Sequence, residues 1–231
     1  MREEGVMKKK LTCTEITMRQ IQRDIILGKY RPGAKLVIVN LKQDYGVSLS
    51  VVREALTRLT EQELVTLTPN IGFSVVRISR QEIEELKVAR LINEGEAIRL
   101  AIEHGSDQWI QSVRAAYQKL AQTSFSSPET HQLSLEWYEA HRAFHQAIVA
   151  GARNQFLSKI CLRLWNQSEL SRNQELVQGR VMPGLEEHQQ LTRAIAARDL
   201  EGAMAIHRVH LNNGASGQQR WISREEACST T

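Results

Sequence analysis

The sequence of 231 residues predicts a mainly α-helical protein, in which a winged helix-turn-helix at residues 13–77 precedes an all-α bundle of about six helices at residues 78–216. Apolar residues recur at helical spacing along most of the chain, whereas β-prone runs are confined to residues 64–76. Only four prolines interrupt these patterns, and 42% of the residues are hydrophobic. A chain of this size and composition can bury two domain cores.

The helix-turn-helix is predicted from two helical patterns that a tight turn separates. The turn Gly46-Val47-Ser48 has the length that this motif allows, and Ser48 can cap the second helix by accepting a hydrogen bond from a backbone N–H. The second helix carries an apolar stripe at i, i+3, i+4 and i+7, formed by Val52, Ala55, Leu56 and Leu59. Its exposed face is polar and basic and consists of Ser50, Arg53, Thr57 and Arg58. Such a helix fits the major groove, so the sequence predicts double-stranded DNA as a partner.

A β-hairpin wing is predicted immediately after this helix. Two β-prone runs, at residues 64–68 and 73–76, are joined across Pro69-Asn70-Ile71-Gly72, a sequence typical of turns. The net charge of +4 also lies in this part of the chain, since residues 1–76 hold 12 lysines and arginines against 8 acidic residues, and the remainder holds 18 of each. This excess favours contact with DNA phosphates.

In order and spacing, this region resembles the winged-helix domain of the GntR family of bacterial transcription regulators. The resemblance is carried by Lys29-Tyr30-Arg31-Pro32-Gly33, Tyr45-Gly46-Val47-Ser48, Val52-Arg53-Glu54-Ala55-Leu56, Arg58-Leu59, Leu64-Val65 and Gly72-Phe73. Together with the exposed helix face, it predicts DNA contacts from Lys35, Lys42, Ser48, Ser50, Arg53, Thr57, Arg58 and Gly72. The chain departs from the family at Val39 and Leu49, where a basic residue is usual, so its operator need not match the common half-site. Glu63 replaces a helix-ending glycine, which costs little if its φ is not positive.

The composition excludes several classes of protein. No apolar run approaches the length of about 18 residues that a membrane span needs, and the N-terminal residues lack the apolar core of a signal peptide. We therefore expect a cytoplasmic protein without a membrane partner. The cysteines Cys13, Cys161 and Cys228 are odd in number and far apart, which argues against a disulfide framework or a thiolate zinc site. The polar segments 1–12 and 217–231 are expected to be flexible.

The second domain begins where Ser79-Arg80-Gln81-Glu82 provides a capping-box pattern for a new helix. Beyond this point the amphipathic patterns are helical, and they break at glycines, at serine-rich segments and at Pro128 and Pro183. The predicted helices span residues 80–104, 107–123, 130–150, 154–178, 184–198 and 200–214. Their lengths and short connections predict a bundle.

Four histidines of this bundle suggest a metal site. His141 and His145 stand at i and i+4, so they lie on one helix face with Cβ atoms about 5–6 Å apart. His188 and His210 belong to two later helices, and side chains from three helices can converge inside a bundle. Neutral imidazole suits Zn, Ni, Cu or Fe. An isolated pair at this spacing is more often satisfied or solvated, so the residues alone leave both interpretations open.

Residues 80–214 resemble the FCD ligand-binding domain of the FadR subfamily within the GntR regulators. The resemblance is carried by Arg90, Glu94, Leu100-Ala101, Phe144-His145, Glu187-His188, Ala194-Ile195, Arg198-Asp199, Ala203 and His210. It implies a divalent metal held by His145, His188 and His210, with His141 in the place of an acidic residue. His207 stands three residues before His210, near enough to be a substitute ligand, although a position in the core or on the surface is favoured. An all-nitrogen set is neutral where the usual set is anionic, which would favour Zn or Ni or leave the site without metal.

The same resemblance implies that the metal, or the pocket around it, holds a small organic acid whose carboxylate pairs with an arginine. Arg90 is the first candidate for this role, and Arg163 and Asn166 are further candidates. From the residues alone, Arg90 could equally form an exposed i,i+4 ion pair with Glu94. Residues 136–145 are similar to members of the family that control dicarboxylate catabolism, which implies a short dicarboxylate as the effector.

These expectations predict a regulator rather than an enzyme. A homodimer would present two winged helices to a pseudo-palindromic operator, because one reader helix covers only a few base pairs, and acid binding would alter their spacing or angle. The resemblance implies repression. Two alternatives use the same histidines: a direct metal sensor, in which metal alone controls DNA binding, and a metal-dependent hydrolase, for which Glu187 is the one acid adjacent to a predicted ligand.

Overall fold

The structure, a computed structural model, describes residues 11–127, 133–176 and 184–213, the side chains of residues 171–176 excepted. The chain divides into two compact units, one of residues 1–25 and 29–76 and the other of residues 26–28 and 77–231. Residues 1–10 and 217–231, for which flexibility is predicted, lie outside the described part. Within the described ranges, every helix is too short or too polar to cross a membrane.

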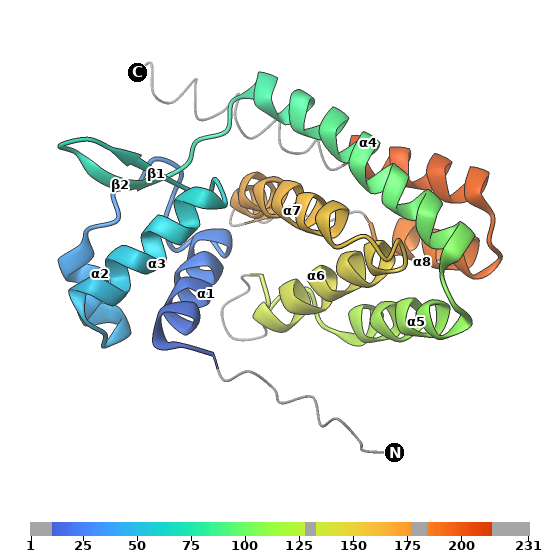
Figure 1. Cartoon of the computed structure of the whole chain (residues 1–231), viewed down its shortest axis with the longest axis horizontal. Coiled ribbons are helices and arrows are strands. Elements are labelled where there is room, and N and C mark those ends of the chain that lie inside the picture. The colour runs from blue at the N-terminus through green and yellow to red at the C-terminus, as the bar shows by residue number, and fades with distance from the viewer. Residues whose placement is uncertain (1–10, 128–132, 177–183, 214–231) are drawn as a thin grey trace. The chain divides into compact units, whose positions relative to one another are not determined.

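The first unit consists of three helices and a two-stranded antiparallel sheet. Its elements are α1 (Cys13–Ile26), α2 (Ile38–Tyr45), α3 (Leu49–Glu61), β1 (Val65–Thr68) and β2 (Gly72–Val75) (Figure 1). α1 begins at a reciprocal cap, in which the hydroxyl of Thr12 accepts from the N–H of Glu15 at 3.2 Å and the Glu15 carboxylate accepts from the N–H of Thr12 at 2.8 Å. These bonds satisfy N–H groups that the first helical turn leaves unpaired.

α2 and α3 form the predicted helix-turn-helix. Gly46 ends α2 in the left-handed region with a φ of 64°, and its N–H donates to the carbonyl of Lys42. Ser48 then caps α3 by accepting a hydrogen bond from the N–H of Val51 at 3.3 Å. The predicted apolar stripe is confirmed, because its four members are fully buried: Val52, Ala55, Leu56 and Leu59.

β1 and β2 form the predicted wing. The register pairs Val65 with Val75, Thr66 with Ser74, Leu67 with Phe73 and Thr68 with Gly72. The hairpin turns at residues 69–71, where Asn70 adopts the left-handed region that this residue tolerates better than most. Lys35 forms an isolated antiparallel bridge with Ser74, so the segment before α2 is held against the wing.

Glu63 in place of a helix-ending glycine costs little stability only if its φ is not positive, and this condition is not met. Its φ is 56°, in the left-handed region that disfavours side chains. The chain adopts this conformation where α3 ends, because the N–H of Leu64 returns to the carbonyl of Leu59 at 3.1 Å before β1 begins. Glu63 therefore stores local strain at a position where glycine would not.

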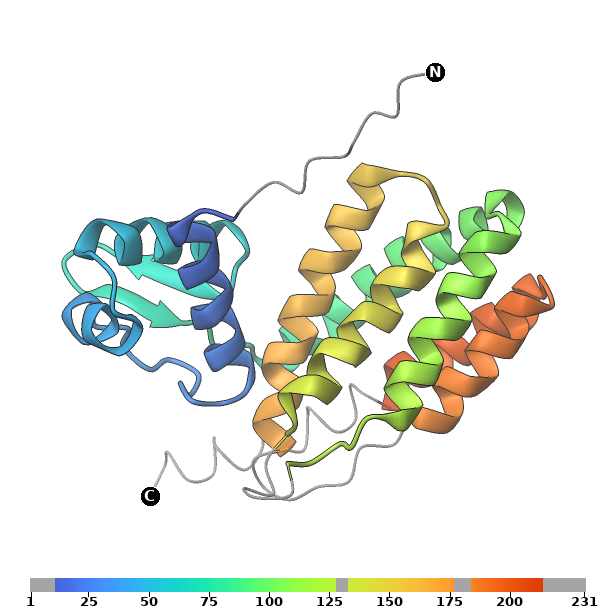
Figure 2. The ribbon, with the colours of Figure 1, turned by 90° about the horizontal axis from the view of Figure 1, so that it is seen from below.

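The second unit is a bundle of six helices within the described residues, and the predicted fold class is confirmed. The helices are α4 (Arg80–His104), α5 (Asp107–Gln122), α6 (Leu135–Ala150), α7 (Gln155–Leu176), α8 (Leu185–Ala196) and a helix at residues 200–213. α6 packs between α5 and α7, as Figure 2 shows, while α4 packs on α6 and α7 and α8 packs on α5. α4 begins as predicted, since both hydrogen bonds of the capping box between Ser79 and Glu82 are present.

Some helix boundaries differ from the predicted ones because local backbone geometry sets them. The helix predicted at residues 130–150 begins at Leu135, since Ser134 is extended and its hydroxyl caps the first turn. The helix predicted at residues 184–198 ends at Ala196, and Arg198 has a φ of 53° that no α-helix continues. The predicted helical residues 130–132, 177–178 and 214 lie outside the described part of the chain.

Trp109 of α5 belongs to the bundle core and contacts α6. Its indole N–H donates to the carbonyl of Ala147 at 2.8 Å. A Cβ atom at Gly105 or Gly151 would come within 2.3 Å of the Trp109 ring, so both glycines are required for this packing. The contact holds α6 in place, and α6 carries two of the four histidines.

Candidate functional site

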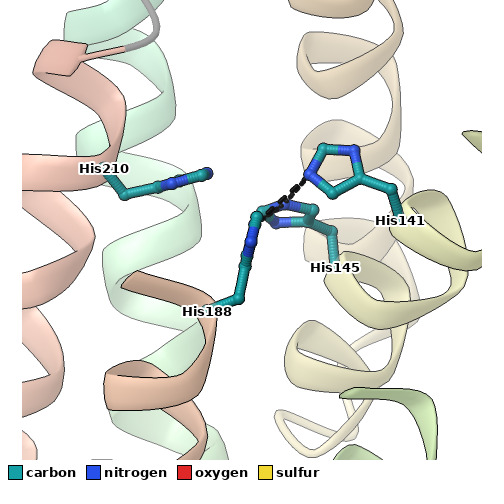
Figure 3. A group of neighbouring side chains, drawn as sticks. All are labelled: His141, His145, His188 and His210. Atoms are coloured by element: carbon teal, nitrogen blue, oxygen red, sulfur yellow. Dashed lines mark hydrogen bonds between the residues drawn. The ribbon is translucent and has the colours of Figure 1, made fainter. Parts of the chain in front are cut away.

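Four histidine side chains meet inside the bundle. His141 and His145 lie one turn apart on α6, His188 lies in the first turn of α8, and His210 lies on the helix at residues 200–213. Figure 3 shows their rings converging from these three helices. The Nε2 atom of His141 lies 3.1 Å from that of His145 and 3.3 Å from that of His188, and the latter two are 3.3 Å apart. Counting His210, one ligand atom from each residue lies within 4.8 Å of the others.

The spacing of these nitrogen atoms fits a shared metal ion. With metal–nitrogen bonds of about 2.0–2.1 Å, two ligands of a tetrahedral ion lie about 3.3–3.4 Å apart. The separations of 3.1 and 3.3 Å among the three Nε2 atoms are close to that value. Hydrogen bonding does not explain all three contacts. Each nitrogen of a neutral imidazole is either a donor or an acceptor, so among three nitrogens in mutual contact at least two donors or two acceptors face each other.

Two carboxylates lie on the far side of the imidazole rings. The Oε2 atom of Glu187 is 3.1 Å from Nδ1 of His210, and the Oε2 atom of Glu169 is 3.8 Å from Nδ1 of His141. A carboxylate near Nδ1 orients a ring so that Nε2 faces the metal, and it makes the imidazole a better ligand. Sequence reasoning noted Glu187 as a neighbour of His188 but missed Glu169, which no spacing rule connects to the histidines.

Burial keeps the imidazole of His145 uncharged. Part of the residue is accessible, but its ring is enclosed by the rings of the other three histidines. Desolvation lowers the pKa of His145 well below the ordinary value of 6.5, and repulsion from neighbouring imidazolium charges lowers it further. The uncharged form is the one that binds a metal, so His145 can act as a ligand at neutral pH.

A cavity of ≈ 30 Å³ adjoins the cluster at His145. Most of its wall is apolar, and its polar wall groups include Glu94, Trp165 and His207. Trp165 is buried, and its indole N–H has no hydrogen-bond partner among the described residues. The volume holds about two water molecules, so an acid of more than a few atoms must displace side chains.

Arg90 and Glu94 form a buried ion pair on α4. The Arg90 Nε donates to Oε1 of Glu94 at 2.7 Å, its Nη2 donates to Oε2 at 3.2 Å, and its Nη1 donates to Ser168 at 2.8 Å. Of the two interpretations open for Arg90, the ion pair is therefore present, but it is buried rather than exposed. Glu94 lines the cavity, and its Oε2 lies 3.7 Å from Nε2 of His207. A carboxylate ligand must compete with Glu94 for the guanidinium group.

The three predicted effector contacts, Arg90, Arg163 and Asn166, are not among the described residues that line the cavity. Arg163 is exposed on α7. Asn166 is buried on the same helix, and its Oδ1 has no hydrogen-bond partner within the described ranges. Cys161 is buried and lines the cavity, and desolvation raises the pKa of its thiol to about 12. Such a thiol stays protonated and unreactive at neutral pH.

The predicted DNA contacts lie on the surface of the first unit. Six of them are exposed: Lys35, Lys42, Ser48, Ser50, Arg53 and Thr57. Arg58 is partly buried and pairs with Glu54 on the same helix at 2.5 Å, whereas Arg53 forms no ion pair with any described residue. Gly72 has a φ of 102°, and a Cβ atom there would meet nothing within 4 Å, so conformation rather than space requires glycine.

Comparisons with known proteins cover both units. The model of the bacterial regulatory proteins, gntR family, matches residues 14–75, and the FCD domain model matches residues 85–213. The HTH-type transcriptional repressor GlaR of Escherichia coli (strain K12) is 32% identical over 200 residues, which cover 84% of this chain and 90% of that protein. The HTH-type transcriptional regulator BphR of Paraburkholderia xenovorans (strain LB400) is 29% identical over 206 residues, 87% of this chain and 83% of that protein.

Solved structures share the fold. The structure of E. coli McbR/YncC has a TM-score of 0.73 at 22% identity and covers 94% of this chain and 100% of that chain. The structure of a transcriptional regulator of the GntR family from Pseudomonas syringae pv. tomato str. DC3000 has a TM-score of 0.55 at 21% identity, and the match covers 94% of this chain and 88% of that chain. At these identities the likeness shows the fold alone, a helix-turn-helix unit followed by a helical bundle.

Proposed function

Because the chain belongs to the gntR family of bacterial regulatory proteins and carries an FCD domain, we propose that it represses transcription under the control of a small organic acid. In this proposal the first unit binds a double-stranded DNA operator. The bundle holds a divalent metal, Zn or Ni, beside which the acid binds. Its relatives are named as transcription regulators, which supports a regulator rather than an enzyme.

The mutual distances of three Nε2 atoms, 3.1 and 3.3 Å, carry the metal proposal. Nitrogen ligands suit Zn or Ni, whereas Mg, Ca and Mn prefer oxygen. When bound, a divalent ion supplies a positive charge and a coordination position for an anion. Neutral imidazole ligands add no negative charge, so a bound ion would keep positive charge that can attract a carboxylate.

The cavity beside His145 supports a small carboxylate as the effector. Its carboxylate would lie at the histidine cluster and its body against the apolar wall, which includes Ile98, Val149 and Leu162. A dicarboxylate, the class that the family resemblance implies, would place its second group near Glu94. There it must take Arg90 from Glu94, or accept hydrogen bonds from other groups on the wall.

Operator binding is proposed to involve two copies of the chain. A recognition helix contacts only a few base pairs, so a homodimer with twofold symmetry would read a pseudo-palindromic site. The acid would act by favouring a dimer whose two winged helices do not match the operator spacing. This requires that the acid bind the two dimer states with different affinities.

The metal and the acid are tested together on the purified protein. We expect about one Zn or Ni per chain by elemental analysis, lost in His145→Ala and kept in His104→Ala, a matched exposed histidine. A panel of mono- and dicarboxylates should raise the melting temperature of the wild type and of His104→Ala only. Absence of metal, with acid binding unchanged in His145→Ala, would reject the metal-anchored pocket and leave the DNA-binding unit unaffected.

The histidine cluster also favours a second candidate, a direct metal sensor. Four protein ligands complete a tetrahedral ion, and closed sites of this kind are typical of structural or sensory metals rather than of metals with an open position. Titrating operator binding with Zn or Ni alone, and then with acids at constant metal, separates the two functions. A response to metal alone supports the sensor, and a response to acid at constant metal supports the effector.

A further inference from the structure

The exposed face of α3 begins with an apolar residue. Leu49, the first residue of the helix, is 47% exposed and directly follows the Ser48 cap. Leu49, Arg53 and Thr57 stand at i, i+4 and i+8, so they lie along one face of the helix, outside the buried stripe. The start of a recognition helix is the part that commonly contacts base edges.

The polar groups near this face are partly engaged within the helix. The hydroxyl of Thr57 donates to the carbonyl of Arg53 at 2.9 Å, and Arg58 pairs with Glu54. The guanidinium of Arg53 forms no ion pair with the residues that the structure describes. A duplex that approaches this face therefore meets a long cationic side chain and, one turn before it, the methyl groups of Leu49.

We propose that Leu49 reads the C5-methyl group of a thymine in the major groove, beside a guanine that Arg53 reads. The inference rests on the proposed function, in which α3 enters operator DNA. Thymine displays a methyl group on the major-groove edge that apolar side chains recognise, and guanine displays two acceptors that match a guanidinium group. Leucine has no donor, so it cannot make the contact with guanine that a basic residue would make at this position.

The spacing of the two residues limits the distance between the two bases. Four residues of α-helix rise about 6 Å, and successive bases are about 3.4 Å apart along the duplex. The thymine should therefore lie within about two base pairs of the guanine in each half-site. This gives the operator a testable pattern before its sequence is known.

The test uses the full-length protein and operators enriched from random duplex DNA. Each thymine of the enriched site is replaced in turn by deoxyuridine, which lacks only the methyl group, and affinity is measured by fluorescence anisotropy. At one thymine per half-site, within two base pairs of a guanine, we expect affinity to fall about fourfold, the factor for exposing one methyl group. The Leu49→Ala variant should show no such loss at that position.

Leu185→Ala is the matched control, because Leu185 lies in the second unit with the same exposure of 47%. It should retain the full deoxyuridine effect, and both variants should unfold at the wild-type temperature. The inference is overturned if deoxyuridine lowers the affinity of the wild type and of Leu49→Ala equally, or if it lowers affinity at no thymine. Neither result contradicts operator binding itself. Failure to enrich any sequence overturns the proposed function itself and this inference with it.

Discussion

At the scale of single residues, the bundle keeps two opposite charges away from water. Arg90 and Glu94 are 6% and 5% exposed, and their hydrogen bonds use both carboxylate oxygens. Their mutual attraction largely offsets the hydration that both groups lose on burial. The pair therefore adds little net stability, whereas the loss of one partner leaves a buried charge without compensation.

We expect Glu94→Gln to lower the free energy of unfolding by about 3 kcal/mol, because the guanidinium of Arg90 stays buried without its counter-ion. Chemical denaturation followed by circular dichroism measures the change. Glu103→Gln is the control, since Glu103 pairs with Arg99 on the surface of the same helix, and it should change stability little. Equal effects of the two variants would contradict the role of burial.

His207 should make stability depend on pH. Burial lowers the pKa of His207 below the ordinary value of 6.5 in the folded chain, although the charge of Glu94 opposes this shift. The unfolded chain therefore binds a proton more readily, so the contribution of His207 is fully present above pH 6.5 and is lost as pH falls towards the folded pKa. In metal-free protein, His207→Asn should flatten the decline in unfolding free energy between about pH 7 and pH 5, and His104→Asn should not.

At the scale of elements, two helix ends in the first unit use left-handed backbone. Gly46 ends α2 with a φ of 64°, and Glu63 follows α3 with a φ of 56°. The two positions need the same backbone conformation, but only one carries the residue that adopts it without strain. The two helix ends therefore differ in backbone strain, although both adopt the left-handed conformation.

Opposite substitutions at these ends should have opposite effects. A Cβ at Gly46 meets no atom within 4 Å, so Gly46→Ala tests backbone strain alone and should destabilise the winged unit by about 1 kcal/mol. Glu63→Gly should instead stabilise it, by less than about 1 kcal/mol, because glycine also gains entropy in the unfolded chain. Urea denaturation of both variants measures the changes, and destabilisation by Glu63→Gly would show that its side chain outweighs the strain.

At the scale of the whole molecule, regulation requires the helical bundle to influence DNA binding by the winged unit. Allosteric coupling free energies are typically about 1–3 kcal/mol, a factor of about 5–150 in affinity, and the proposed function requires one between acid and operator. Coupling of this size is enough to switch operator occupancy. It also has a thermodynamic consequence, because each ligand must change the affinity of the other by the same factor.

We expect saturating acid to weaken operator binding by a factor of about 5–150, and saturating operator to weaken acid binding by the same factor. Fluorescence anisotropy gives the first factor, and calorimetry with and without operator DNA gives the second. His145→Ala should abolish both effects. Unequal factors at equilibrium would mean that an additional species, such as a change in oligomeric state, takes part.

Much of the fold could be predicted because its signals are local. The helical period of the apolar stripe in α3, the caps at Ser48 and Ser79 and the turn at Gly46 each depend on residues within about one helical turn. The pairing of His141 with His145 follows from the same spacing rule. The sequence by itself therefore determined the element order, the reader helix and half of the histidine cluster.

The rest depended on which helices pack together. Only the tertiary structure decided that His188 and His210 meet the pair on α6, that Glu169 lies behind His141, and that the Arg90–Glu94 pair is buried. No short segment contains this information, because a side chain's burial and partners come from other helices far along the chain. Burying a charge or an unpaired polar group is unfavourable in free energy, so such groups are stable in the bundle only where another helix supplies a partner.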